Sequence, residues 1–598
     1  NYVGGQPWAA SLLFALTLAM SAVPEEIPVA FSSFMALGAY KMSKLGIISR
    51  QPQVIENLGS VSVICLDKTG TITQNKMAIQ AIYDHEKNLL LEPKDNMIEI
   101  GKNVLAYGVL ASESDPFDAM EKAIWEAYRL RVTEKGILAR KMIYEYPLEG
   151  LPPMMTHVYD DGNSKLVAGK GAVERIVRIC RLNREEEETI MKHTRSLGSK
   201  GYRVIGVAGA IYNEHQLPAA QDNFGWQFKG LLALYDPPKK NIADVISKFY
   251  KAKIGVKLIT GDYPETAMNI AGQAGIEDNL HYISGDQVIK MSNEELKQAV
   301  NNTNIFARMF PDAKLRVIDA LKANGEIVAM TGDGVNDAPA LKSANIGIAM
   351  GEKGTEIARQ ASDLVLTDDN LDRMVDAIKE GRKIFSNLKK GVRYIISIHI
   401  PIILTASLPV IFGWTYPNIF TPIHVIFLEM IMGPTCSIFF EKEPVEKNIM
   451  EQLPRERSKG LFTREELLVS LVQGLIIAAG VLILYYYFMQ AGNTLEQTRT
   501  IVFTTLILSN VFLTFVNRSF NRTIYYTSRY QNPLVPVILI ISTLFLVALH
   551  FIPFVRELFR LSGITIAQFG LCFAIAFASV MWFEVYKTGL PDNTHVDS

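Results

Sequence analysis

The sequence predicts a multidomain α/β protein joined to a bundle of membrane-spanning helices. Hydrophobic residues make up 49% of the 598 residues and the mean hydropathy is +0.14, which is high for a protein without membrane segments. Charged residues gather between about residues 40 and 390, whereas both ends are apolar. The formal net charge of -1 argues against a nucleic-acid partner, and the four scattered cysteines argue against a disulfide framework or a zinc site.

A short apolar stretch, residues 61–66, predicts a buried strand that ends in a carboxylate and a turn. In an open α/β sheet the chemistry lies just beyond the carboxyl end of a strand. Asp67 is therefore placed like a nucleophile, with Lys68 beside it to hold negative charge. The alternative reading is that Asp67 is an ordinary N-cap of the following helix.

Two further strands end in the same kind of turn. Residues 256–259 lead into Thr260, Gly261 and Asp262, and residues 327–330 lead into a second Thr-Gly-Asp that ends at Asp333. We expect these turns to face the same point as Asp67. Acidic residues at several such turns can hold Mg²⁺, which prefers oxygen ligands.

The apolar ends of the chain predict membrane spans. Residues 9–35 are long enough to cross a bilayer, but prolines 24 and 28 flank two glutamates and should unwind the helix locally. A carboxylate at this depth costs about 2.5–3.5 kcal/mol, so it marks a functional site unless the pair merely caps a kink at the interface. Six more spans are expected at about residues 392–412, 421–440, 466–488, 499–517, 533–553 and 563–586.

The heptapeptide Asp-Lys-Thr-Gly-Thr-Ile-Thr at residues 67–73, together with Gly-Asp-Gly-Val-Asn-Asp-Ala-Pro-Ala-Leu at 332–341, closely resembles the signatures of P-type ATPases. The resemblance extends from end to end. It implies a haloacid dehalogenase-like Rossmann phosphorylation domain with an inserted α+β nucleotide-binding domain, and about seven transmembrane helices. The implied parts are a kinked span (1–46), the phosphorylation domain (47–79 and 236–368), the insertion (80–235), a stalk (369–391) and a six-helix membrane domain (392–598).

The resemblance also implies the residues of a site that uses ATP and Mg²⁺. The implied catalytic residues are Asp67, Lys68, Thr69, Thr260, Gly261, Asp262 and Lys314. The implied Mg²⁺ residues are Asp67, the Thr69 carbonyl and Asp333, with Asn336 and Asp337 closing the site, and the implied nucleotide residues are Tyr146, Lys170 and Arg203. Taken alone, Lys314 is equally an exposed helix charge, and the Gly-Lys-Gly-Ala around Lys170 is usually only a turn.

The transported ion is expected at Glu25, Glu429 and His399. Glu25 matches the first glutamate of the kinked fourth membrane helix of these pumps. The other positions depart from the calcium pattern: His399 and Glu429 stand in place of amides, Ile402 in place of a carboxylate and Gly433 in place of an aspartate. His399 is alternatively a packed histidine bonded to a backbone carbonyl.

Two features of the family's cycle are absent from this sequence. No Thr-Gly-Glu-Ser occurs, so we expect the actuator domain and the first membrane helices to belong to a longer protein. Related phosphatases carry an acid/base aspartate two positions after the nucleophile, where this chain has Thr69. An aspartyl-phosphate at Asp67 should therefore decay slowly.

We therefore expect a cation pump of the calcium-type branch, with Ca²⁺ as the first choice and Mn²⁺, Mg²⁺ or a proton as alternatives. A membrane-tethered haloacid dehalogenase-like phosphohydrolase is the alternative of another class; Thr69 and the intramembrane carboxylates oppose it. The expected protein is a monomeric, multi-pass protein of the plasma membrane with cytoplasmic catalytic domains. Its expected partners are ATP, the cation and the bilayer.

Overall fold

The computed structural model describes residues 22–589, apart from 53, 94–95, 117, 130–139, 151, 417, 447 and 456–460, together with residues 8, 12, 15, 16 and 19. The chain forms two compact units. One consists of Gly46–Arg50 and Val61–Val375, and the other of Asn1–Leu45, Gln51–Ser60 and Asp376–Ser598.

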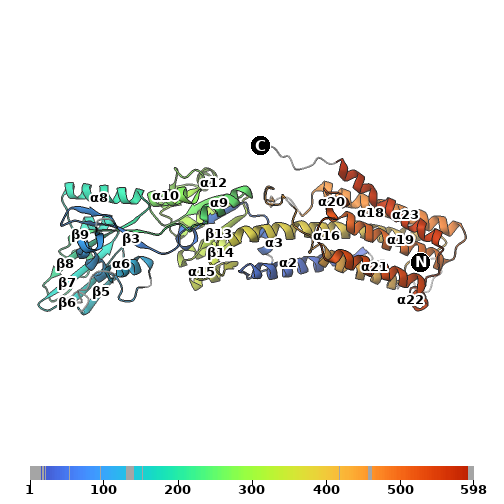
Figure 1. Ribbon diagram of the computed structural model, residues 1–598, viewed down its shortest axis with the longest axis horizontal. Coiled ribbons are helices and arrows are strands. Elements are labelled where there is room, and N and C mark those ends of the chain that lie inside the picture. The colour runs from blue at the N-terminus through green and yellow to red at the C-terminus, as the bar shows by residue number, and fades with distance from the viewer. Residues whose placement is uncertain are drawn as a thin grey trace. The chain divides into compact units, whose positions relative to one another are not determined.

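The first unit contains an eight-stranded sheet in the order β1-β15-β14-β13-β2-β10-β12-β11. Figure 1 labels β13 and β14 of this sheet. Strand β2 lies between β10 and β13 and runs parallel to both, and only the edge strand β1 is antiparallel to its neighbour. The carboxyl ends of the three central strands therefore share one edge of the sheet. The strands are β1 (Ile47–Ser49), β2 (Val63–Leu66), β10 (Gly255–Ile259), β11 (Ile283–Ser284), β12 (Ile305–Ala307), β13 (Val328–Gly332), β14 (Ile346–Met350) and β15 (Leu364–Leu366).

Helices pack against this sheet over a continuous hydrophobic core. Cys65 and Met330 on the central strands are fully buried in one core with Val317 and Leu341 from the helices that follow. Helix starts are well marked: Ser292 and Glu295 form a capping box, and a proline opens α13. The helices are α9 (Ile242–Lys251), α10 (Pro264–Ala274), α11 (Gly285–Lys290), α12 (Asn293–Asn302), α13 (Pro311–Ala323), α14 (Ala338–Ser343) and α15 (Glu356–Ala361).

A second, antiparallel sheet of seven strands lies in the chain between β2 and β10, where the sequence predicts an inserted domain. Its order is β4-β3-β9-β8-β7-β6-β5. The strands are β3 (Ala78–Asp84), β4 (Leu89–Leu91), β5 (Met142–Glu149), β6 (Met154–Asp161), β7 (Ser164–Gly171), β8 (Arg203–Tyr212) and β9 (Gln227–Tyr235). The helices are α4 (Met97–Ile100), α5 (Lys102–Leu110), α6 (Ala119–Arg129), α7 (Val173–Ile179) and α8 (Arg184–Ser199).

Helices cover both faces of the second sheet (Figure 1). On one face α5 and α6 pack on Val207 and Leu232, whereas on the other α7 and α8 pack on Val167 and Leu231. Because side chains alternate along a strand, neighbouring residues of β5, β6 and β7 belong to different cores. This alternation decides which residues can share a ligand.

The second unit is helical. Its helices are α2 (Glu26–Lys44), α3 (Val54–Leu58), α16 (Asp372–Ile411), α17 (Pro422–Pro434), α18 (Arg464–Gln490), α19 (Leu495–Val516), α20 (Ile524–Thr527), α21 (Leu534–Phe551), α22 (Pro553–Leu558) and α23 (Ile566–Thr588), with a π-helical turn η5 (Thr435–Phe439) after α17. Within the described residues, six helices are long and apolar enough to cross a membrane: α16, α17 with η5, α18, α19, α21 and α23.

These six helices confirm the six spans predicted after residue 391. The predicted first span, residues 9–35, lies largely outside the described residues. Its second part is α2, which begins at Glu26, and residues 23–25 before it are not helical. The helix is therefore interrupted at Pro24 as predicted, whereas Pro28 lies in the first turn of α2.

Candidate phosphorylation and ion-binding sites

Asp67 lies directly after β2, where its carboxylate is held from two sides. Lys314 Nζ on α13 is 2.8 Å from Asp67 Oδ1 and 2.5 Å from Asp337 Oδ1. The backbone N–H of Thr69 donates to Asp67 Oδ2 at 3.0 Å. All three side chains of this ion-pair group are buried. Lys314 is thus part of the site and not an exposed helix charge.

The turn after Asp67 requires glycine at position 70. Gly70 has φ +68°, and a Cβ added there would lie 2.8 Å from Asp333 Oδ2. The absence of a side chain therefore lets the β2 turn approach the turn after β13. A second link joins the same strands, because Asp67 N–H donates to Thr331 Oγ1 at 3.1 Å.

The turn after β10 completes the site from the other side. Lys68 Nζ lies 2.6 Å from Asp262 Oδ2, and buried Thr260 accepts a hydrogen bond from Asp262 N–H at 3.2 Å. Although burial opposes the ionised form, Lys68 and then Arg203 lower the pKa of Asp262. Arg203, on β8, therefore acts electrostatically on the turn that holds Asp262. The three strand ends converge as the sequence predicts.

Three carboxylates at this point suit a magnesium ion. Oxygens of Asp67, Asp333 and Asp337 lie within 4.8 Å of one another, and an oxygen-only donor set is what Mg²⁺ prefers. Burial and Asp67 raise the pKa of Asp333 to about 7. Burial opposes the charge on Lys314, but Asp67 and Asp337 outweigh it and raise its pKa. Asn336 is exposed and so lies at the rim.

We expect Mg²⁺ binding at this site to weaken as the pH falls below about 7. The pKa of Asp333 is raised to about 7, so protons compete with the metal below that pH and not above it. The apparent dissociation constant should rise by up to about tenfold per pH unit on the acidic side. Calorimetric titration with Mg²⁺ between about pH 8 and 6 measures this. An affinity that does not change over this interval would contradict the assignment of Asp333.

The predicted nucleotide residues do not all come together. Lys170 on β7 faces α5 and α6, where its Nζ pairs with Glu121 Oε1 at 2.6 Å. Tyr146 on β5 points to the opposite face: its ring is buried beside Phe224, and its hydroxyl donates to Pro218 O at 2.6 Å. Tyr146 and Lys170 therefore lie on opposite faces of the sheet, and the assignment of Tyr146 to the nucleotide stays a prediction.

Of the two adjacent glutamates, Glu26, which sequence reasoning missed, is the one whose carboxylate is buried between the helices of the second unit. Its Oε2 lies 3.5 Å from His399 Nε2 on α16. Both side chains are buried, and neither the Glu26 oxygens nor His399 Nε2 has a hydrogen-bond partner among the described residues. Glu25 is the exposed N-cap residue of α2. Such unpaired polar atoms inside a membrane domain are donors for an ion.

His399 and Glu429 surround the same point. Nδ1 of His399 is bonded to Ile395 O at 3.0 Å, which fixes the ring and leaves Nε2 directed at Glu26. Glu429, on α17, lies close enough to Glu26 and Glu25 to interact electrostatically with both. A Cβ on Gly433 would lie 3.9 Å from Glu26 Cγ, so the missing aspartate at that position leaves room for the Glu26 side chain.

Two family models and several curated proteins match this chain. Residues 61–345 match the family model described as haloacid dehalogenase-like hydrolase, and residues 417–588 match the one described as the C-terminus of cation transporting ATPases. A calcium-transporting ATPase 1 of Bacillus cereus is 30% identical over 96% of this chain and 68% of its own length.

Two other relatives match over similar spans. One is a calcium-transporting ATPase 1 of Saccharomyces cerevisiae (28% identical, over 100% of this chain and 67% of its own length). The other is a probable cation-transporting ATPase F of Mycobacterium bovis (29% identical, over 94% of this chain and 67% of its own length). The membrane helices, the family models and these relatives together show that the chain belongs to the P-type cation-transporting ATPases. These are integral membrane enzymes that couple ATP hydrolysis to cation transport.

Proposed function

We propose that this chain is the catalytic and membrane part of a Ca²⁺ pump that is phosphorylated by ATP on Asp67. The observation that carries the proposal is the convergence of Asp67, Lys314 and Asp333 at the carboxyl ends of adjacent parallel strands. Relatives named calcium-transporting ATPases support Ca²⁺ as the cation. The phosphohydrolase alternative is not favoured, because the membrane helices and these relatives point to transport.

In the proposed reaction, one carboxylate oxygen of Asp67 attacks the γ-phosphorus of ATP. The new bond joins this oxygen to phosphorus, the bond from the γ-phosphorus to the β,γ-bridging oxygen breaks, and ADP leaves. Lys314 and the Thr69 N–H orient the attacking carboxylate. Thr260, Gly261, Asp262 and Lys68 form the adjacent turn that receives the phosphoryl oxygens.

The donor set at Asp67 fits Mg²⁺, which would supply positive charge to the phosphate oxygens when bound. Asp67, Asp333 and the Thr69 carbonyl would hold it. Asp337 anchors Lys314, and Asn336 closes the rim. We place the nucleotide near Lys170 and Arg203, since Arg203 lies close to Asp262.

We place the transported ion between Glu26, His399 and Glu429. The two carboxylates are hard oxygen donors, which suits Ca²⁺. The imidazole of His399 would shift the preference toward Mn²⁺. We also propose that the protein is monomeric and lies in the plasma membrane with its phosphorylation site in the cytoplasm.

A phosphorylation experiment tests this proposal. The chain in detergent, with Mg²⁺ and γ-labelled ATP, should form an acid-stable, hydroxylamine-labile adduct whose amount rises with Ca²⁺. The dependence on Ca²⁺ is expected because a pump that phosphorylates without its ion would waste ATP. Labelling that is independent of Ca²⁺ and Mn²⁺ would contradict the proposed cation, and no labelling at all would contradict the phosphorylation.

A further inference from the structure

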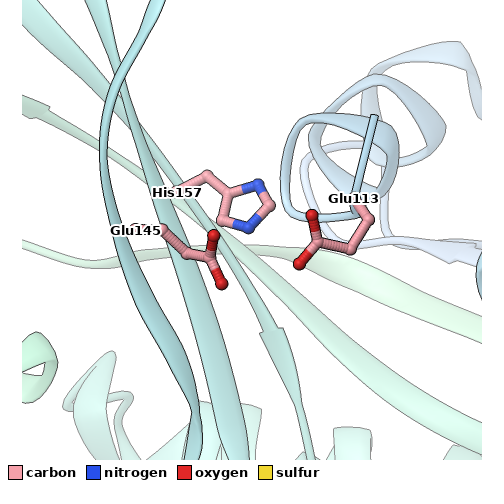
Figure 2. A group of neighbouring side chains, drawn as sticks. All are labelled: Glu113, Glu145 and His157. Atoms are coloured by element: carbon pink, nitrogen blue, oxygen red, sulfur yellow. The ribbon is translucent and has the colours of Figure 1, made fainter. Parts of the chain in front are cut away.

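Three side chains with metal-binding atoms gather on the α5 side of the seven-stranded sheet, away from the phosphorylation turns. They are Glu145 on β5, His157 on β6 and Glu113 in the segment between α5 and α6 (Figure 2). One donor atom from each lies within 4.8 Å of the other two. Glu145 and His157 are cross-strand partners in the antiparallel pair, so their side chains share a face.

His157 is oriented as a ligand. It is 0% exposed, and its Nδ1 is bonded to Leu110 O at 3.0 Å. That bond to a carbonyl requires a proton on Nδ1, which leaves the lone pair on Nε2. Nε2 is buried and has no hydrogen-bond partner among the described residues. In Figure 2 one ring nitrogen points toward the two carboxylate groups.

The segment that carries Glu113 is held firmly in place. Glu113 N–H donates to Glu121 Oε2 at 3.3 Å, and Trp125 Nε1 donates to Glu113 O at 2.8 Å. The nearest ammonium, on Lys170, is already compensated by Glu121 at 2.6 Å. Among the described residues, neither half-buried carboxylate forms an ion pair with a lysine or arginine, and both face the free nitrogen of His157.

This donor set selects a class of ion. Ligands on one Zn²⁺ at about 2.0–2.2 Å lie at most about 4.4 Å apart, so small rotations of the glutamate side chains would close the group. One imidazole and two carboxylates match the ligand types of zinc sites with three protein ligands and an open position. Mg²⁺ and Ca²⁺ prefer all-oxygen shells, and the imidazole favours a transition metal.

We propose that Glu113, Glu145 and His157 form a binding site for one divalent transition-metal ion, for which Zn²⁺ is the best fit. The site is separate from the Asp67 cluster and from the intramembrane ion site. A metal there would join β5 and β6 to the segment between α5 and α6. Ala111 in this segment accepts a hydrogen bond from Lys170 Nζ, so occupancy would also fix the lysine that we place near the nucleotide.

Equilibrium binding of radioactive Zn²⁺ to the metal-stripped full chain tests the proposal. Excess Mg²⁺ is present to fill the Asp67 cluster, and ATP is omitted, so the result is independent of phosphorylation. We expect the unmodified chain to bind one more Zn²⁺ per chain than either Glu113→Gln or Glu145→Gln. These two changes keep the shape of half-buried side chains, whereas replacing fully buried His157 would risk the fold.

Glu126→Gln is the matched control, because Glu126 is an exposed glutamate on the neighbouring helix α6. It should keep the full stoichiometry. Co²⁺ substituted into the unmodified chain should show d–d absorption that both glutamine variants at positions 113 and 145 lose. Equal Zn²⁺ stoichiometry in the unmodified chain and these two variants would overturn the proposal, as would loss of the ion in Glu126→Gln alone.

Discussion

Asp67→Asn is expected to abolish phosphorylation by ATP, with a loss of about 10³-fold or more. An amide nitrogen or oxygen cannot replace the carboxylate as the nucleophile toward phosphorus. The measurement is acid-stable incorporation of γ-labelled phosphate in the presence of Mg²⁺ and Ca²⁺. Asp286→Asn is the matched control, because Asp286 is an exposed aspartate on helix α11 in the same unit as Asp67. This variant should label normally.

Loss of labelling in Asp67→Asn should not come from unfolding. Burial, with a further contribution from Asp337, raises the pKa of Asp67, so a neutral side chain relieves part of this strain. Lys314 keeps Asp337 as its partner at 2.5 Å and is not left with an unpaired buried charge. The melting temperature should therefore stay the same or rise. Retained labelling in a folded Asp67→Asn protein would contradict the account.

Glu26→Gln is expected to weaken the ion dependence of phosphorylation much more than Glu25→Gln. Glu26 is the buried carboxylate beside His399, whereas Glu25 is the exposed N-cap residue of α2. Loss of one charged ligand should raise the Ca²⁺ concentration for half-maximal labelling by on the order of tenfold to a hundredfold. The two adjacent glutamines are matched in chemistry and differ only in position.

The comparison of these two variants decides which carboxylate faces the ion. A larger shift in Glu25→Gln would return the site to the position that the sequence resemblance implies. His399→Ala should lower the response to Mn²⁺ more than the response to Ca²⁺, because imidazole is the softer ligand. Equal responses to both ions in His399→Ala would remove His399 from the site.

The convergence of the three turns around Asp67 could be predicted because it follows from the order and direction of the strands. β2, β10 and β13 are adjacent and parallel, so residues that follow them in the sequence must meet at one edge. The sequence also shows an oxygen-only set of carboxylates near Asp67. It does not show that Lys314 reaches Asp67 and Asp337 together, since Lys314 follows in a distant helix.

The nucleotide and ion sites depend on which face of a strand or helix each side chain lies on, and the sequence alone indicates this poorly. The pairing of β5 and β6 shifts register between Tyr146 and Glu149, and Tyr146 lies on the face opposite to Lys170. Likewise, a glutamate pair between two prolines could present either side chain to the interior, and only the structure shows that Glu26 is buried and Glu25 is exposed. Neither result follows from residue type.

The Glu113, Glu145 and His157 group could not be predicted either. Its members come from three separate elements, and no fixed spacing marks them as ligands. A sequence signal existed only for His157, an imidazole close to Met155 and Val158 in β6, where a satisfied core histidine is the usual interpretation. The free Nε2 appears only when Leu110 O is seen to occupy Nδ1.

Direct location of the phosphoryl group tests the central claim most directly. The chain is labelled with ATP, Mg²⁺ and Ca²⁺, and the acyl-phosphate is then reduced with borohydride, which converts the modified aspartate to homoserine. Mass spectrometry of the peptide that spans residues 63–73 should find homoserine at position 67. Homoserine at Asp262, Asp333 or Asp337, with Asp67 unchanged, would contradict the account.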